Sequence, residues 1–482
     1  LYERNRDTDN VTNKMVFKGN IEYLTENEIG IRLRATQQNP SVLPAESLYA
    51  IEHDTMDTTF RSMYQGLYIY LSARKERRDL LLSQRPPRFD ESLDSMISRS
   101  EDDFTRIALK AKAAQDYFLL IGPPGTGKTS CALKKMVETF HADKDAQILL
   151  LSYTNRAVDE ICKSLASIAP AVDFIRVGSE LSCDEAYRGH LIENELSSCN
   201  RRSEVYERIR NCRIIVGTVA AISGKPELFR LKHFDVAIID EATQILEPQL
   251  LGILCARGED GKDAIDKFVL IGDHKQLPAV VQQNTEQSAI YDESLLSIGL
   301  TNLKDSLFER LYRNCTATVH RSYDMLCRQG RMHPEVALFA NRAFYGGRLI
   351  PVGLPHQIES SDTICRLAFY PSVPEKAGAS AKINYSEARI VADLAVRIYE
   401  DHQADFDESR TLGIITPYRS QIALIKKEIE SLGIPALNRI LVDTVERFQG
   451  SERDVIIYSF CVNYPYPVSY THLRAHETRH DL

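Results

Sequence analysis

The amino-acid sequence predicts an α/β protein with two successive parallel sheets. Between residues 117 and 271, short uninterrupted apolar runs alternate with segments of helical periodicity, and a second series of this kind begins near residue 315. Apolar runs without alternation are typical of strands buried on both faces, and strands that alternate with helices form parallel sheets covered by those helices. We therefore expect two consecutive α/β domains behind a smaller N-terminal module.

The apolar runs and the helical periodicity place the individual elements. In the first series, the expected strands are Tyr117–Ile121, Ile148–Ser152, Phe174–Val177, Ile214–Val216, Val236–Ile239 and Phe268–Ile271. The expected helices there are Ser130–Phe140 and Arg156–Ile168, followed by a charged helical insertion at 179–212. In the second series, the expected elements are the strands Thr411–Ile415, Ile440–Val442 and Val455–Phe460 and the helices Ser386–Tyr399 and Ser420–Ser431.

The N-terminal region, residues 1–98, is expected to be a β-barrel-like and helical accessory module. Short alternating runs predict strands at Asn20–Leu24 and Ile29–Arg34. Helical spacing of apolar residues follows over 45–82 and leads to a basic cluster, Arg74, Lys75, Arg77 and Arg78. The cluster is either a phosphate contact or a solvated helix face. Arg85–Arg88, with two prolines between the arginines, is interpreted as a linker.

Composition and charge exclude several classes of protein. The 482 residues are 43% hydrophobic and 26% charged, with a net charge of −8, which is ordinary for a folded globular chain. No run approaches the roughly 18 apolar residues that span a membrane, so no membrane partner is expected. The negative net charge disfavours non-specific nucleic-acid binding, because phosphate contacts need Lys and Arg, but it is compatible with a local basic channel.

The ten cysteines are scattered singly, with no Cys-x-x-Cys pair. A zinc or iron–sulfur site and a disulfide framework are therefore not expected. Reduced cysteines fit the cytoplasm of a bacterium or the nucleus of a eukaryote. The chain begins at Leu1 and not at Met, which indicates a piece of a longer protein, so the absence of a visible targeting segment decides nothing.

A phosphate-binding loop lies between the first predicted strand and helix. Residues 122–129 match the pattern GxxxxGK[ST] in this context. The expected binding residues are Gly122, Pro123, Pro124, Gly125, Thr126, Gly127, Lys128 and Thr129. Glycines let backbone N–H groups surround a phosphate in front of a helix N-terminus. Lys128 is expected to reach the β- and γ-phosphates of a nucleoside triphosphate, and Thr129 is expected to bind Mg²⁺.

Two further strands deliver polar side chains to the same edge of the predicted sheet. The strand Val236–Ile239 ends in Asp240 and Glu241, which are expected to bind Mg²⁺ and to take a proton from the attacking water, respectively. The strand Phe268–Ile271 leads to Gln276, which can hydrogen-bond the γ-phosphate or the water and so distinguish ATP from ADP. From the residues alone, the prediction is an ATPase with a nucleotide-sensing loop.

Four segments in this order resemble superfamily 1 helicases. They are SYTNRAVDEI (152–161), DEAT (240–243), GDHKQLP (272–278) and VERFQGSERD (445–454). The similarity is greatest to the branch that holds the nonsense-mediated-decay RNA helicase and the replication helicase/nuclease; SYTNRAVDEI, DYFLLIGPPGTGKTS and TPYRSQI favour the latter. The resemblance extends from about residue 11 to about residue 464. It implies two tandem RecA-like P-loop domains, with ATP and Mg²⁺ bound in the cleft between them.

The resemblance also implies roles for individual residues. Arg331, in GRMHP, matches an arginine of the second domain that reaches the γ-phosphate, and Gly450 and Glu452 match a nucleotide-facing motif. The residues that match a single-stranded nucleic-acid track are Thr154, Asn155, Thr218, Pro417, Tyr418 and Thr444. Hydroxyl and amide groups can hold phosphates, and a ring can face bases. Taken singly, each track residue could instead serve a turn or a helix cap.

The resemblance implies an ATP-driven translocase on single-stranded DNA that moves 5′ to 3′. The domains expected from it are an accessory module at 1–98, a first RecA-like domain at 99–312, a second at 313–466 and a tail at 467–482. A covalently linked nuclease is expected upstream of Leu1. Two alternatives are an RNA helicase of the decay type and a truncated module that binds ATP and grips nucleic acid with weak hydrolysis.

The sequence departs from the family at three places. Gly330 stands where the family usually has an aromatic residue that stacks on adenine, and no glutamine-centred adenine motif precedes the phosphate loop. The tail at 467–482 resembles translated sequencing-adapter DNA, so the final motif with a second arginine finger is expected to be missing. In the other interpretation, a divergent tail uses Arg474 or Arg479 as that finger.

Overall fold

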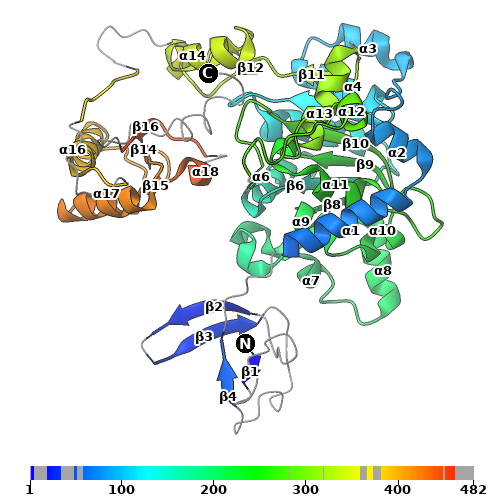
Figure 1. The fold of residues 1–482 in the computed structure, drawn as a ribbon, viewed down its shortest axis with the longest axis horizontal. Coiled ribbons are helices and arrows are strands. Elements are labelled where there is room, and N and C mark those ends of the chain that lie inside the picture. The colour runs from blue at the N-terminus through cyan, green and yellow to red at the C-terminus, as the bar shows by residue number, and fades with distance from the viewer. Residues whose placement is uncertain are drawn as a thin grey trace. The chain divides into compact units, whose positions relative to one another are not determined.

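The computed structural model divides into two compact units, Leu1–Arg61 and Ser62–Leu482 (Figure 1). It describes residues 2–4, 19–25, 27–33, 48–51, 58–279, 281, 283–318, 320–358, 366–372, 382–448 and 451–461. The predicted tail at 467–482 and Gly450 lie outside these residues.

The smaller unit contains two antiparallel strand pairs. β1 (Tyr2–Arg4) pairs with β4 (Leu48–Ala50), and β2 (Gly19–Leu24) pairs with β3 (Ile29–Leu33). The two strands predicted in this region are therefore confirmed to within a residue at each end. The described residues form these two pairs only, and closure into a barrel stays a prediction.

A seven-stranded parallel sheet is the centre of the larger unit. Its order is β11-β5-β10-β9-β6-β8-β7. The strands are β5 (Tyr117–Ile121), β6 (Ile148–Ser152), β7 (Phe174–Val177), β8 (Ile214–Thr218), β9 (Phe234–Ile239), β10 (Ile265–Gly272) and β11 (Tyr323–Met325). The bounds of β5, β6 and β7 agree with the prediction, and β8, β9 and β10 are longer than predicted.

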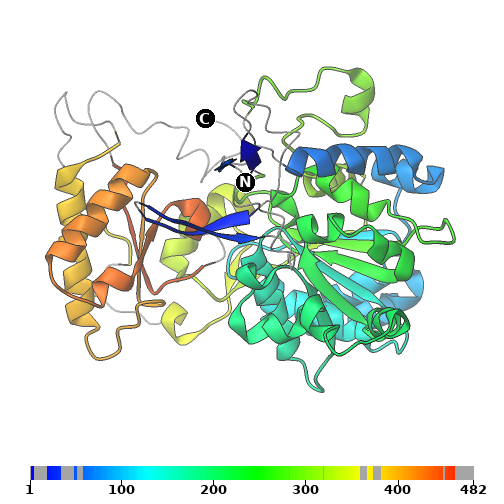
Figure 2. The ribbon, with the colours of Figure 1, turned by 90° about the horizontal axis from the view of Figure 1, so that it is seen from below.

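Both faces of this sheet are buried under helices (Figure 2). In β5, Tyr117, Leu119 and Ile121 belong to one hydrophobic cluster, whereas Phe118 and Leu120 belong to the other. One cluster includes side chains of α4 (Asp103–Ala113), α5 (Lys134–His141) and α6 (Asn155–Ala166). The other includes side chains of α2 (Lys75–Leu81), α9 (Val219–Ser223), α10 (Glu227–Leu231), α11 (Glu247–Leu254) and α13 (Leu307–Ala317). Uninterrupted apolar strands therefore identify a sheet covered on both sides.

Further helices belong to this part of the chain. They are α1 (Thr58–Ser72), α3 (Asp94–Arg99), α7 (Ile192–Glu195), α8 (Arg202–Asn211) and α12 (Glu293–Ser297). Residues 179–212 contain α7, α8 and two short 3-10 helices, so the predicted helical insertion is confirmed.

The basic cluster after α1 is structural. Arg77 is buried and donates from Nη2 to the carbonyl oxygens of Ile265 and Asp266, at 2.6 and 3.1 Å. Lys75 pairs with Asp79 at 2.6 Å on the surface of α2. Because Arg77 ties α2 to β10, the helical part of the predicted accessory module, residues 62–98, groups with the larger unit.

Arg85 and Arg88 form a clamp, which corrects the interpretation of this stretch as a linker. Both guanidinium groups bond the carboxylate of Asp116, with N–O distances from 2.8 to 3.1 Å, and the Arg88 backbone N–H adds a bond of 2.7 Å. These bonds to arginine hold the pKa of Asp116 below its usual range, although burial opposes them. Since Asp116 directly precedes β5, the clamp fixes the strand that leads into the phosphate loop.

A second, smaller parallel sheet follows, with the order β15-β14-β16 among the described residues. Its strands are β14 (Leu412–Ile415), β15 (Leu441–Asp443) and β16 (Val455–Tyr458). Side chains of α16 (Tyr385–Asp401) and α17 (Arg419–Ser431) form a hydrophobic cluster with these strands. α18 (Val445–Phe448) follows β15. The predicted strands and helices of the second series are confirmed with small shifts at their ends.

The segment between the two sheets contributes to the first. β11 pairs with β5, although it lies beyond residue 312, where the first domain was expected to end; that boundary falls inside α13. Next come β12 (Arg328–Gln329), α14 (Pro334–Tyr345), β13 (Ile350–Pro351) and α15 (Pro355–Ile358). β12 and β13 form a parallel pair.

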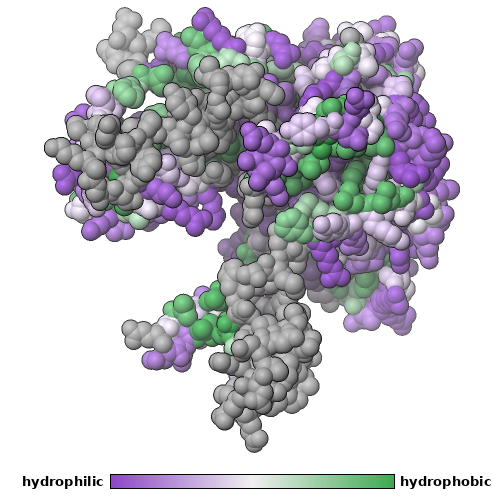
Figure 3. All heavy atoms as spheres, viewed as in Figure 1, coloured by the Kyte–Doolittle hydropathy of each residue, from purple (hydrophilic) through white to green (hydrophobic). Residues whose placement is uncertain are grey.

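The surface of the larger unit is mainly hydrophilic on the face seen in Figure 3. Within the part of the chain that the structure describes, no helix is both long enough and apolar enough to cross a membrane.

Candidate nucleotide and nucleic-acid sites

Three loops meet at the carboxyl edge of the seven-stranded sheet. The phosphate loop follows β5, the sensing loop follows β10, and Asp240 and Glu241 follow β9. β10 pairs with both β5 and β9, so the three loops leave neighbouring strands at one edge. Parallel sheets bind ligands at this edge, and the predicted convergence of the three motifs is confirmed.

The phosphate loop has the backbone that its glycines predict. Gly125 and Gly127 have φ values of +72° and +75°, which residues with a Cβ atom rarely adopt. A helical segment begins at Lys128, with one π-helical turn at Lys128–Leu133 that continues into α5. The helix therefore starts two residues before the predicted Ser130, and Lys128 and Thr129 occupy its first turn.

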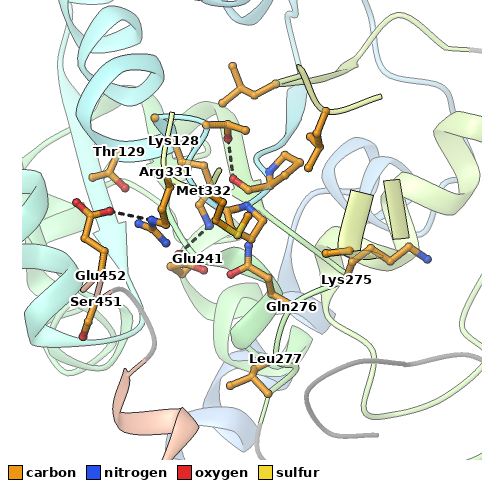
Figure 4. Close-up of a pocket in the computed structure, with 18 of the residues that line it drawn as sticks. Lys128, Thr129, Glu241, Lys275, Gln276, Leu277, Arg331, Met332, Ser451 and Glu452 are labelled. Carbon is orange, nitrogen blue, oxygen red and sulfur yellow. Dashed lines mark hydrogen bonds and ion pairs between the residues drawn. The ribbon is translucent and has the colours of Figure 1, made fainter. Parts of the chain in front are cut away.

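Lys128 forms an ion pair with Glu241 (Figure 4). The distance from Nζ to Oε1 is 2.9 Å, and both side chains are largely buried. The positive charge of Lys128 lowers the pKa of Glu241 against the opposing effect of burial, and the two nearby carboxylates raise the pKa of Lys128. Gln244 donates from Nε2 to the other oxygen of Glu241 at 3.0 Å. Glu241 is therefore held as a carboxylate beside the phosphate loop.

Thr129 and Asp240 bring two oxygen ligands together. The Thr129 hydroxyl donates to Oδ2 of Asp240 at 2.5 Å, and Oδ1 of Asp240 accepts from the Glu241 backbone N–H at 2.9 Å. Burial and the neighbouring Glu241 raise the pKa of Asp240 to about 6. A hydroxyl and a carboxylate suit a hard cation such as Mg²⁺, whose positive charge would favour the ionised carboxylate.

Gln276 is held by Asp273, for which the sequence predicted no role. Its Nε2 donates to Oδ2 of Asp273 at 2.8 Å. Asp273 is fully buried and also accepts from the Lys275 backbone N–H at 3.0 Å and from the Tyr345 hydroxyl at 2.7 Å. Asp273 stands inside the GDHKQLP segment, so the motif was visible in the sequence, but no sequence signal pointed to its partner Tyr345.

Arg331, in the turn between β12 and α14, lies against the phosphate loop. The N–H of the preceding Gly330 donates to the carbonyl oxygen of Gly125 at 2.8 Å. A Cβ placed on Gly125 would lie 2.3 Å from the Cβ of Arg331, which only glycine permits. Figure 4 shows Arg331 beside Lys128 and Glu452. Its guanidinium donates from Nε to Oε2 of Glu452 at 2.8 Å. The structure thus places Arg331 and Glu452 with the phosphate loop.

Two buried glutamines brace the turn that carries Arg331. Gln329 bonds both the N–H and the carbonyl oxygen of Met332, each at 2.8 Å. Gln357 donates from Nε2 to the carbonyl oxygens of Gln329 and Met332, at 3.0 and 2.9 Å. Leu354 and His356 both contact Gly330. A Cβ added to Gly330 would lie 3.2 Å from Cδ1 of Leu354, and the carbonyl oxygen of Gly330 lies 3.0 Å from Nε2 of His356.

The track residues of the first sheet cap helices. Thr154 follows β6 and Thr218 is the last residue of β8, and these two strands are neighbours in the sheet. The Thr154 hydroxyl accepts from the N–H of Ala157 at 3.2 Å, and the Thr218 hydroxyl accepts from the N–H of Ala221 at 3.1 Å. Asn155 is the first residue of α6. The structure therefore brings these residues to one edge, where both threonines have the helix-cap role that was the alternative.

The track residues of the second sheet also share an edge. Pro417 and Tyr418 follow β14, Thr444 follows β15, and these two strands pair. The Tyr418 ring has the amino group of Lys382 at 6.0 Å from its centroid. The Thr444 N–H bonds Oδ1 of Asp443 at 2.8 Å. A ring with a cation over it and a loop N–H are groups that nucleic-acid sites use, without being specific to them.

Comparison with known proteins supports the interpretation of these motifs. Two family models, each described as an AAA domain, match the chain: one over residues 99–205 and 192–284, the other over 303–465. The chain carries the AAA domains of superfamily 1 helicases. Their matched ranges contain the phosphate loop, Asp240 and Gln276 in the first case and Arg331 and Glu452 in the second.

The chain is also similar, over most of its length, to DNA replication helicase/nucleases. The DNA replication ATP-dependent helicase/nuclease DNA2 of Gallus gallus is 28% identical in an alignment of 447 residues that covers 88% of this chain and 41% of that protein. The DNA replication ATP-dependent helicase/nuclease JHS1 of Arabidopsis thaliana is 27% identical, over 93% of this chain and 34% of that protein. The chain is thus distantly homologous to helicase/nucleases of the DNA2 type and spans about two fifths of their length or less.

A solved structure of an arterivirus helicase, nonstructural protein 10 in complex with DNA, also matches. The match covers 70% of this chain and 62% of that chain, at 14% identity and a TM-score of 0.31.

Proposed function

We propose that this chain is the ATP-driven motor of a helicase that translocates on single-stranded DNA. One observation carries the proposal: Lys128, Asp240, Glu241 and Gln276 meet at one sheet edge, and Arg331 approaches the same loop from the segment that leads to the second sheet. A set with this chemistry provides a charge for phosphate, a ligand for Mg²⁺, a base, a water-facing amide and a γ-phosphate arginine.

Each residue has one task in the proposed reaction. Backbone N–H groups of Gly122–Thr129 and the ammonium of Lys128 bind the phosphates of ATP. Thr129 and Asp240 would hold Mg²⁺, whose charge would offset that of the phosphates. Glu241 takes a proton from the attacking water, and Gln276 orients that water. Before ATP binds, Lys128 pairs with Glu241 at 2.9 Å, so the arriving phosphate frees Glu241 to act as a base.

Motion follows from Arg331 and its neighbours. Arg331 bonds Glu452 at 2.8 Å, and a bound γ-phosphate would compete for the same guanidinium. In this proposal the two sheets belong to two RecA-like domains, at 99–312 and 313–466, except that β11 joins the first sheet. ATP draws the two domains together, and hydrolysis releases them. Each cycle then advances the single-stranded DNA, 5′ to 3′ as in the helicase branch that the sequence resembles. The DNA is held by Thr154, Asn155, Thr218, Pro417, Tyr418 and Thr444.

The choice of DNA rests on the relatives. Those matched here are named as DNA replication helicase/nucleases, and we carry their substrate over to this chain, with a linked nuclease as partner and a nuclear location in a eukaryote. Two other functions remain as outcomes of the test. They are an RNA helicase of the decay type, and a truncated module that grips nucleic acid with weak hydrolysis.

The test measures ATP turnover of residues 1–482 alone, with single-stranded DNA and with single-stranded RNA. A second chain, extended to the C-terminus of the parent protein, is measured beside it. We expect stimulation by DNA and a higher rate in the extended chain. Stimulation by RNA alone would replace the DNA assignment, and equal rates in both chains would remove the argument from the missing finger. Hydrolysis that survives Lys128→Ala would overturn the site.

A further inference from the structure

A buried tyrosine at the far end of α14 bonds the loop that carries Gln276. Tyr345 is the last residue of α14 and is 5% exposed. Its hydroxyl donates to Oδ2 of Asp273 at 2.7 Å, and the same oxygen accepts from Nε2 of Gln276 at 2.8 Å. One carboxylate oxygen thus joins the tyrosine to the glutamine, although residues 273 and 345 are 72 positions apart.

The donors around Asp273 determine which end of the Gln276 amide faces the carboxylate. Asp273 receives the Lys275 N–H on Oδ1 and the Gln276 and Tyr345 groups on Oδ2. A carboxylate that receives donors on both oxygens accepts only, so the NH₂ end of the Gln276 amide must face it. The carbonyl oxygen Oε1 is then the end left for a bound group in the cleft that Gln276 lines. A carbonyl oxygen accepts a hydrogen bond, which suits a water molecule better than a phosphate oxygen.

The turn that precedes α14 and the last residue of α14 both contact loops of the first sheet. At its N-terminal side, Arg331 lies next to Gly330, whose N–H bonds Gly125 of the phosphate loop at 2.8 Å. At its C-terminal end, Tyr345 bonds Asp273. The 12 residues of the helix span about 18 Å. A helix is stiff over this length, so displacement of the arginine end is passed to the tyrosine end.

The turn after Tyr345 is itself fixed. Gly346 ends α14 with φ +59°, and its N–H bonds the carbonyl oxygen of Asn341. The Asn341 side chain exchanges two hydrogen bonds of 2.9 Å with the backbone of Leu349. The tyrosine ring therefore has little freedom to leave Asp273 unless the whole helix moves.

We propose that Tyr345 is a positioning residue for ATP hydrolysis, acting through Asp273 on Gln276. Its hydroxyl keeps the carboxylate in place, and the carboxylate keeps Oε1 of Gln276 toward the attacking water. Because Arg331 lies in the braced turn just before α14 and Tyr345 is the last residue of that helix, the amide is in position only when the arginine is. This inference rests on the proposed ATPase and adds a residue that connects two of its parts.

The test uses Tyr345→Phe, Gln276→Ala and the double variant. Tyr117→Phe is the matched control, since the Tyr117 hydroxyl is also buried but lies 3.4 Å from the sulfur of Cys315, away from the cleft. We expect Tyr345→Phe to lower kcat by about 10- to 100-fold, with KM for ATP and the Kd for ADP unchanged. Tyr117→Phe should leave kcat unchanged. In the Gln276→Ala background, Tyr345→Phe should change kcat by less than about twofold, because the two residues act through one contact.

Normal kcat in Tyr345→Phe, or losses that multiply in the double variant, would overturn the proposal. A wild-type chain without Lys128-dependent hydrolysis would instead overturn the proposed function. In that event, hydrogen exchange of the Lys275 and Gln276 amides decides the positioning role. Faster exchange in Tyr345→Phe but not in Tyr117→Phe supports it, and equal exchange in all three proteins refutes it.

Discussion

Arg331 donates from Nε to Oε2 of Glu452 at 2.8 Å, across 121 positions of sequence. Glu452 is largely exposed, whereas Arg331 is two-thirds covered. The bond orients the guanidinium before any nucleotide is present, next to a phosphate loop whose Gly125 leaves room for it. An exposed ion pair of this kind is worth about 0.2–1 kcal/mol. In the proposed function, the γ-phosphate of ATP therefore replaces Glu452 as the partner of Arg331 at a small cost in free energy.

Arg331→Lys should reduce ATP turnover by about 10³-fold. Lysine keeps the charge but loses the planar fork that bonds a phosphate and the transition-state charge. Binding of ADP should change little, because ADP has no γ-phosphate for the arginine to contact. The measurement is steady-state hydrolysis together with ADP titration. Arg342→Lys, which changes an exposed arginine of α14, is the control. A rate for Arg331→Lys within threefold of this control would contradict the proposed role.

Glu241→Gln should stop hydrolysis and preserve ATP binding. The amide cannot accept a proton from water, and loss of a general base costs about 10²–10⁴ in rate. Lys128 loses its charged partner, which is 2.9 Å away in the wild type, so its ammonium becomes freer for phosphate. Binding of a labelled ATP analogue and single-turnover hydrolysis separate these effects. The exposed Glu227→Gln serves as control, and weakened ATP binding in Glu241→Gln would argue against a role in the chemical step.

Asp116→Asn should lower the free energy of unfolding by about 1–3 kcal/mol at neutral pH. The amide cannot accept the paired bonds from Arg85 and Arg88. These bonds hold the pKa of Asp116 below its ordinary value of 3.8. The stabilisation is therefore complete above about pH 5 and is lost as the pH falls from 3.8 toward the folded pKa.

Denaturant titrations of Asp116→Asn and wild type at several pH values test this sign. The difference between them should be constant from pH 5 to 7 and shrink toward pH 3. Asp143→Asn removes a surface pair with Lys112 and should change stability by less than about 0.5 kcal/mol. A difference between Asp116→Asn and wild type that grows on acidification would contradict the clamp.

Thr154→Ala should lower stability by about 1 kcal/mol, because it removes the cap of α6. Ser306→Ala removes the cap of α13, where the hydroxyl accepts from the Glu309 N–H at 3.3 Å, and should have a similar effect on unfolding. If Thr154 also lines the track, only Thr154→Ala weakens stimulation of ATP turnover by single-stranded DNA. Equal stimulation in both variants would leave Thr154 with the cap alone.

The sequence was most informative where one kind of pattern dominates. β5, β6 and β7 have the predicted bounds because strands buried on both faces are apolar at nearly every position. Arg176 in β7 is buried as well, but it pairs with Asp159. Strand ends of a parallel sheet lie at one edge, so the meeting of Lys128, Asp240 and Gln276 followed from their places after strands. The role of the basic cluster after α1 could not be predicted from the sequence. An arginine that faces solvent and one that bonds buried carbonyl oxygens, as Arg77 does, give the same sequence pattern.

The two α/β series, the nucleotide motifs and their convergence at one sheet edge could be predicted from the sequence, because periodicity and strand–helix alternation are local features of short stretches of residues. The tertiary structure alone decided what each polar group contacts. Asp273 meets Tyr345, Arg331 meets Glu452, and Arg85 and Arg88 close on Asp116. Such partners are separated by up to 121 positions, and their hydrogen bonds depend on distances of a few ångströms that only the packing of sheets and helices sets.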